Sequence, residues 1–126
     1  MRCLAVDDEP LALTVIRQFC KRTPFLTLEW EALSAIEAKK IIESNPVDLI
    51  FLDINMPNMN GLEVLQKMKD NKMKIKVLVL TIHSEVEYLL KAVDIGVNGY
   101  LLKDSESAEL KKAIVAVMNG DNYIQP

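Results

Sequence analysis

The stretch Val47-Asp48-Leu49-Ile50-Phe51-Leu52-Asp53 decides the fold of this 126-residue chain. Its run from Val47 to Leu52 is nearly continuously apolar, which is typical of a strand covered on both faces, because neither side of such a strand meets water. Residues 75–80 form a second run of nearly the same kind. Two such runs predict a parallel sheet with helices on both of its faces.

Three further apolar runs, at residues 3–6, 26–30 and 100–102, bring the expected strands to five. Between and after the runs, apolar side chains recur with the period of a helix that buries one face: Leu11, Ala12, Val15, Ile16 and Phe19; then Val86, Leu89, Leu90 and Val93; then Leu110, Ala113, Ile114 and Val117. Strands and helices alternate strictly. This order predicts the α/β class, with five strand–helix pairs in a doubly wound parallel sheet joined by right-handed crossovers.

Helix start and stop signals agree with this order. Three pairs have the spacing of a capping box, in which two side chains bond the free amides of a first turn: Ser34 with Glu37, Ser84 with Glu87 and, as a weaker version, Asn60 with Glu63. Pro10 suits the first turn of a helix. Gly96 and Gly120 stand where helices are expected to stop.

The composition narrows the class of protein. Half of the residues are hydrophobic and 26% are charged, which excludes a disordered or low-complexity chain. The net charge of −3 makes the chain by itself a poor candidate for gripping a nucleic-acid backbone. Two cysteines form no disulfide framework, and neither a signal peptide nor a membrane span is expected. We therefore expect a cytoplasmic domain.

Polar side chains follow four of the five apolar runs. Asp7 and Asp8 follow the first run, Asp53 the third, Thr81 the fourth and Lys103 the fifth. Because the carboxyl ends of parallel strands lie at one edge of the sheet, these groups are expected to converge there. Taken singly, each has an ordinary explanation as a loop, cap or strand residue. The hypothesis of a site depends on their occurring together.

Clustered carboxylates repel one another unless a cation neutralises them. Mg²⁺ binds oxygen ligands and keeps several waters, so one or two carboxylates suffice to hold it, and Mn²⁺ is a possible substitute. Asp8 and Asp53 are the first candidate ligands. Asp7 is the next, either as a ligand or as the residue that holds a bound water. The backbone carbonyl of Asn55 is placed to add another oxygen.

An aspartate beside Mg²⁺ can act as a nucleophile on a phosphoryl group and form an acyl phosphate. The transfer needs in-line positioning and neutralisation of the charge on the three phosphoryl oxygens. Mg²⁺ takes one oxygen, Lys103 a second, and Thr81 with a loop amide the third. His83, the only histidine, has no partner for a zinc site or a catalytic dyad.

Along essentially the whole chain, these residues resemble the receiver domain of two-component response regulators. Four motifs carry the resemblance: Val6-Asp7-Asp8-Glu9-Pro10, Asp53-x-x-Met56-Pro57-x-x-Asn60-Gly61, Val79-Leu80-Thr81 and Gly99-Tyr100-Leu101-Leu102-Lys103. The resemblance implies a flavodoxin-like three-layer sandwich with strand order 2-1-3-4-5. It also implies a receiver domain at residues 1–120, and a linker or tail that starts at 121–126.

The resemblance assigns a role to each matching residue. Asp53 corresponds to the phosphoacceptor, which a sensor histidine kinase phosphorylates, and Asp7 and Asp8 to the acidic pair that holds Mg²⁺. Lys103 corresponds to the lysine that contacts the phosphoryl group. Thr81 and Tyr100 correspond to the switch hydroxyl and the switch aromatic. Such a domain is a stoichiometric phosphoacceptor rather than a turnover enzyme, and by family analogy it can form a homodimer on phosphorylation.

Three positions depart from the family pattern. Ile82 stands where a small residue is usual, and Val97 replaces a usual alanine. Asp104 replaces a proline that often follows the lysine in a cis peptide, so we expect a trans peptide here. Lys103-Asp104 after Gly-Tyr-Leu-Leu resembles the subgroup fused to a helix-turn-helix DNA-binding domain. Contact with nucleic acid is then expected only through that fused output domain.

Other functions remain open at this point. The chain is either part of a longer transcription regulator or a stand-alone receiver, and a phosphorylation-independent interaction module is a further possibility. A phosphatase of the haloacid-dehalogenase kind would need Asp-x-Asp, but the triplet here is Asp53-Ile54-Asn55. A dinucleotide binder would need a glycine-rich loop that the sequence lacks.

Overall fold

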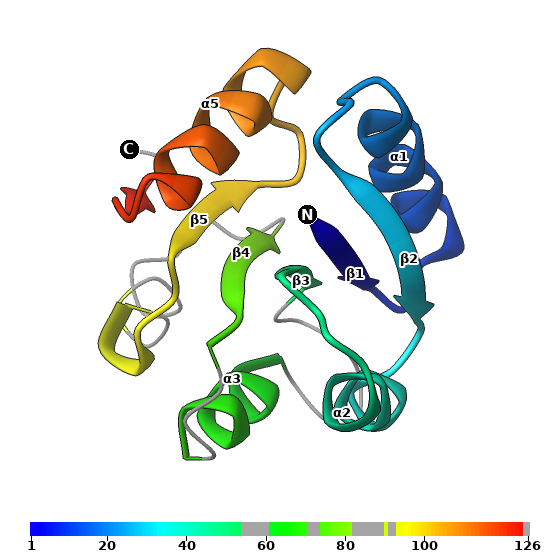
Figure 1. The fold of residues 1–126 in the computed structure, drawn as a ribbon, viewed down its shortest axis with the longest axis vertical. Helices are drawn as coiled ribbons and strands as arrows, with labels where there is room; N and C mark the ends of the chain where they lie inside the picture. The colour runs from blue at the N-terminus through cyan, green and yellow to red at the C-terminus, as the bar shows by residue number, and fades with distance from the viewer. Residues whose placement is uncertain (54–60, 71–73, 82–89, 91–92, 125–126) are drawn as a thin grey trace.

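In the part of the chain that the structure describes, six parallel strands form one sheet with helices on both of its faces (Figure 1). The computed structural model describes residues 1–53, 61–70, 74–81, 90 and 93–124. The strands are β1 (Arg2–Val6), β2 (Thr27–Ala32), β3 (Leu49–Asp53), β4 (Lys76–Thr81), β5 (Gly99–Leu102) and β6 (Tyr123–Ile124). The helices are α1 (Pro10–Lys21), α2 (Ala35–Ser44), α3 (Gly61–Asp70) and α5 (Ser107–Met118). Figure 1 shows α1 and α5 on one face of the sheet and α2 and α3 on the other.

The strand order is β2-β1-β3-β4-β5-β6, so the predicted order of the first five strands is confirmed. β6 is an addition that the sequence pattern does not predict, and it lies inside the stretch 121–126 expected to be a linker or tail. Two residues are too short to show an apolar run. Gly120, with φ of 86°, follows α5, and the amide of Tyr123 then donates to the carbonyl of Asn98 at 2.9 Å.

The core lies in two layers, one on each face of the sheet. Alternate side chains of β3 enter opposite layers, because successive residues of a strand point to opposite faces. Leu49 and Phe51 pack toward α1 and α5, whereas Ile50 and Leu52 pack toward α2 and α3, and all four are fully buried. This burial explains the continuous apolar run that the sequence shows.

Helix caps confirm part of the local prediction. The Ser34 hydroxyl accepts a hydrogen bond from the Glu37 amide at 3.2 Å, and the Glu37 carboxylate accepts one from the Leu33 amide at 3.0 Å. Pro10 is the first residue of α1, as expected. Gly96 follows the helical residues 93–95 with a positive φ of 101°, the conformation expected of a glycine at a helix stop. The pairs Ser84–Glu87 and Asn60–Glu63, and most of the helical pattern at residues 86–93, lie outside the described residues.

None of the helices in the described residues has the length and apolarity needed to cross a membrane.

Substituting Ser34→Ala should lower the free energy of unfolding by about 1 kcal/mol, because the Glu37 amide loses its capping acceptor. Urea unfolding followed by circular dichroism measures this change. Ser44→Ala is the matched control, since Ser44 is an exposed serine at the other end of the same helix. An equal effect of the two substitutions would contradict the capping role of Ser34.

Candidate functional site

Three carboxylates meet where β1 and β3 end. Asp7 and Asp8 directly follow β1, and Asp53 is the last residue of β3. The strands are neighbours in parallel register, with Val6 opposite Leu52, so the chain places the next residues side by side. Each of the three offers an oxygen, and these atoms all lie within 4.8 Å of one another. Asp7 is 2% and Asp53 4% exposed, whereas Asp8 is half-buried.

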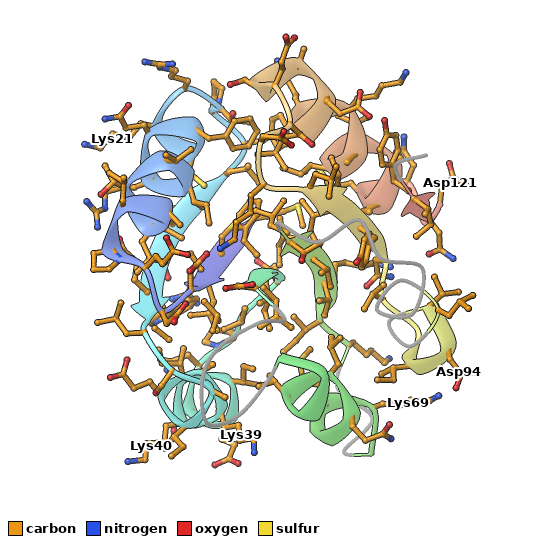
Figure 2. All side chains as sticks on the ribbon, turned by 180° about the vertical axis from the view of Figure 1, so that it is seen from behind. Lys21, Lys39, Lys40, Lys69, Asp94 and Asp121 are labelled. Carbon is orange, nitrogen blue, oxygen red and sulfur yellow. The ribbon has the colours of Figure 1, made fainter. Side chains whose placement is uncertain are left out.

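Lys103 brings a cation to this acidic cluster from the turn after β5. Its Nζ lies 2.7 Å from Asp7 Oδ2, 3.3 Å from Asp53 Oδ2 and 3.9 Å from Glu9 Oε1. Other lysines, such as Lys39, Lys40 and Lys69, extend outward at the edge of the molecule (Figure 2). The inward direction of Lys103 is what buried carboxylates require, because an uncompensated buried charge is costly.

Two opposing effects, burial and the neighbouring carboxylates, determine the pKa of Lys103. Burial by itself lowers the pKa of the ammonium, because a charge loses hydration inside the protein. The hydrogen bond to Asp7 and the negative charges of Asp53 and Asp7 outweigh burial and raise the pKa above the ordinary lysine value. Lys103 therefore keeps its positive charge at neutral pH.

Asp7 is held in place from both sides. Its own amide donates to the carbonyl of Ala32 in β2 at 3.1 Å, and its Oδ1 accepts a hydrogen bond from the Glu9 amide at 3.0 Å. Its other oxygen is the one that faces Lys103. The carboxylate is therefore fixed at the carboxyl edge of the sheet by the start of α1.

Thr81 and Lys103 are linked through the backbone. Thr81 is the last residue of β4 and is fully buried, and its carbonyl accepts a hydrogen bond from the Lys103 amide at 2.8 Å. Tyr100, on β5, is 5% exposed and packs in the core layer that faces α2 and α3. Thr81 thus lies beside the strand end that carries Lys103, whereas the Tyr100 side chain belongs to the apolar core.

The remaining predicted residues either lie outside the described part of the chain or are away from the acidic cluster. Asn55, Ile82 and His83 are outside the described residues, so the predicted carbonyl ligand and the predicted departure at position 82 stay predictions. Val97 is buried in the core layer toward α2 and α3. The trans peptide expected at Asp104 is confirmed, since the described residues contain no cis peptide bond.

The cluster fits a hard divalent cation. All the donors that Asp7, Asp8 and Asp53 offer are carboxylate oxygens, the ligands that Mg²⁺ and Mn²⁺ accept. Lys103 supplies one positive charge against three carboxylates, so the cluster remains electronegative. A metal held by Asp7 would share that carboxylate with the Lys103 ammonium or displace it.

Sequence reasoning missed two features beside the cluster. One is the approach of Glu9 to Lys103, since Glu9 enters the sequence analysis only as part of a motif. The other is a groove of about 370 Å³ between α1 and the start of α5, lined in part by Glu9, Leu11, Val15 and Lys103. The sequence showed Leu11 and Val15 only as members of an apolar stripe, and periodicity does not distinguish a buried stripe from a groove wall. The structure shows both side chains exposed.

A family model, the response regulator receiver domain, matches residues 3–115 of the chain. The chain therefore belongs to the response regulator receiver domain family, as the sequence motifs imply. Phosphorylation and the switching of an output domain are the functions of this family.

Particular relatives extend the comparison. The chain is similar to the nitrate/nitrite response regulator protein NarL of Escherichia coli strain K12, with 36% identity over 118 residues that cover 94% of the chain and 55% of the relative. Among solved structures, a LuxR-family two-component response regulator from Aurantimonas sp. SI85-9A1 has a TM-score of 0.92 at 30% identity, covering 99% of this chain and 89% of that one. A LuxR-family DNA-binding response regulator from Staphylococcus aureus has a TM-score of 0.86 at 29% identity, covering 92% of this chain and 97% of that one. The chain spans about half the length of the curated relatives it matches.

Substituting Lys103→Met should destabilise the metal-free protein by about 2 kcal/mol, because Asp7 and Asp53 lose the cation that neutralises them. Millimolar Mg²⁺ should restore part of this loss. Urea unfolding in EDTA and in Mg²⁺ measures both effects. Lys112→Met, at an exposed site on α5, is the control and should stay within about 0.5 kcal/mol of wild type. Equal stability of the two variants in EDTA would contradict the neutralising role of Lys103.

Proposed function

We propose that this chain is a phosphorylation switch whose phosphoacceptor is Asp53. The observation that carries the proposal is the placement of the Asp53 carboxylate, 4% exposed, within reach of Asp7, Asp8 and the Lys103 ammonium. A nucleophilic carboxylate beside paired acids and a fixed cation suits phosphoryl transfer, which depends on positioning and charge neutralisation.

The proposed donor is a phosphohistidine on a sensor histidine kinase. An oxygen of Asp53 attacks the phosphorus, the bond from phosphorus to the histidine nitrogen breaks, and the nitrogen keeps the electron pair. The product is an acyl phosphate on Asp53. Asp7, Asp8 and Asp53, with the backbone carbonyl of Asn55, would hold Mg²⁺, which when bound would neutralise charge on a phosphoryl oxygen. Lys103 donates a hydrogen bond to a second oxygen, and the Thr81 hydroxyl donates to the third.

The output of the switch is a shift between two conformations. The phosphoryl group adds roughly −1.5 to −2 charge and three strong acceptors, so contacts made only in the phosphorylated state favour that state. The link from the Lys103 amide to the Thr81 carbonyl supports a joint movement of the ends of β4 and β5. Tyr100 lies on β5 and packs in the core layer toward α2 and α3, and we assign it the role of the switch aromatic.

We further propose that the domain acts stoichiometrically in the cytoplasm, within residues 1–120, and that 121–126 begins a connection to an output. A DNA-binding output domain is supported by the similarity to the DNA-binding response regulator from Staphylococcus aureus, and by the fact that the chain spans about half the length of curated relatives such as NarL. A phosphorylation-dependent homodimer is proposed by family analogy alone. In this arrangement contact with DNA is made only through the output domain.

Incubation with Mg²⁺ and acetyl phosphate should add one phosphoryl group to the wild-type chain, measured by intact-mass spectrometry. Asp53→Asn should abolish the adduct, because an amide oxygen is too poor a nucleophile to form the anhydride. Asp104→Asn removes the same charge from an exposed aspartate next to Lys103 and should keep the adduct. An adduct that survives in Asp53→Asn would refute the assignment of the phosphoacceptor.

Thr81→Ala should leave phosphate uptake within about threefold of wild type but reduce the conformational response, because the proposed contact of the hydroxyl exists only in the phosphorylated state. Hydrogen exchange of β5 and α5, compared with and without the phosphoryl group, measures the response. The control is Thr27→Ala, which removes an exposed hydroxyl on β2. A full exchange response in phosphorylated Thr81→Ala would exclude the switch role.

A further inference from the structure

We propose that Glu9 is a specificity-determining residue that disfavours small anionic phosphodonors relative to donors carried on a protein. The inference rests on the proposed function, since it concerns which donors reach Asp53. It is carried by the position of the Glu9 carboxylate at the mouth of the acidic cluster, beside the ammonium that faces the acceptor.

Glu9 is the N-cap residue of α1, but its side chain forms no capping hydrogen bond with the helix. Side chains at this position usually accept a hydrogen bond from the first turn, and short ones do so best. The Glu9 side chain makes no such bond. Its backbone amide is committed to Asp7 Oδ1, and its carboxylate lies 3.9 Å from Lys103 Nζ with 65% of the side chain exposed. The carboxylate is therefore held between solvent and the cluster.

The proposed phosphoryl transfer does not use the negative charge of Glu9. Asp53 is the acceptor and Asp7 and Asp8 suit a metal, so each of these has a task. The cluster with Glu9 contains four carboxylates and one ammonium, which leaves a formal excess of three negative charges. A divalent cation removes two of them. The negative charge that remains in the loaded site equals the one that Glu9 contributes.

A residual negative charge affects donors unequally. A small dianion has few contacts with the protein besides its phosphoryl group, so it experiences the repulsion from Glu9 without compensation. A protein donor makes further contacts and can place a neutral or cationic side chain opposite an exposed carboxylate. Glu9 is thus a repulsive element of the kind that specific sites use against unwanted ligands.

Because Glu9→Gln removes a negative charge, electrostatics predicts weaker binding of the Mg²⁺ cation and faster reaction with an anionic phosphodonor. The rate of phosphate uptake from acetyl phosphate should rise roughly threefold at about 0.1 M ionic strength, whereas the dissociation constant of Mg²⁺ should also rise roughly threefold, which is weaker binding. Phosphoramidate, with its lower net charge, should gain less than acetyl phosphate. A merely structural role of Glu9 would instead impair both properties together.

The experiment compares wild type, Glu9→Gln, Glu9→Asp and Glu106→Gln. Glu106 is the matched control, because it is a glutamate at the N-cap of α5 that also makes no side-chain capping bond. Uptake rates are measured by intact mass at about 0.1 M and 1 M NaCl, and Mg²⁺ affinity is measured by isothermal titration calorimetry. Glu9→Asp and Glu106→Gln should stay near wild type, and the effect of Glu9→Gln should shrink at 1 M NaCl.

The role of Glu9 would be overturned if Glu9→Gln matched Glu106→Gln, if Glu9→Asp matched Glu9→Gln, or if the effect were unchanged at 1 M NaCl. Each of these results presumes a wild-type chain that takes up phosphate at Asp53. A wild-type chain that takes up no phosphate from either donor would instead refute the proposed function, so the two failures are distinguishable.

Discussion

The site depends on the neutralisation of buried carboxylates by the Lys103 ammonium. Asp7 and Asp53 are almost inaccessible to solvent, and without a nearby cation their mutual repulsion and lost hydration would oppose folding. Lys103 lies within 3.3 Å of both and joins the edge of the sheet at β1 and β3 to β5. The same ion pairs that stabilise the cluster in the unphosphorylated protein also hold the proposed acceptor next to a cationic hydrogen-bond donor. The contacts of Lys103 with Asp7 and Asp53 therefore serve both the stability of the fold and the proposed phosphoryl transfer.

This arrangement makes the cluster sensitive to added charge. A metal ion bound by Asp7 would compete with Lys103 for that carboxylate, and a phosphoryl group on Asp53 would offer the ammonium new acceptors. Either event would act on Lys103, whose amide donates a hydrogen bond to the Thr81 carbonyl. β5 in turn pairs with β6, where Tyr123 also donates a hydrogen bond to Glu109 of α5. The backbone thus connects the cluster to the C-terminal end of the described chain.

Much of the site was predictable because parallel strands deliver their terminal residues to one edge. The run before Asp53 identified a doubly covered strand, and the acidic pair after β1 followed from the same topology. The Ser34 cap was predictable because it is a local interaction over three residues. By contrast, β6 was missed because a two-residue strand exists only through pairing with β5. Glu9 was missed because its contact with Lys103 spans 94 positions, which no local pattern reveals.

The sequence by itself determined the α/β class, the strand order implied by its motifs, and which residue types stand at the strand ends, since these follow from local periodicity and chain direction. Only the tertiary structure decided that Lys103 contacts Asp7 more closely than Asp53, that Tyr100 packs in the core, and that Glu9 faces an ammonium instead of capping its helix. The reason is physical: side-chain direction and charge pairing depend on neighbours that folding brings together from distant parts of the chain.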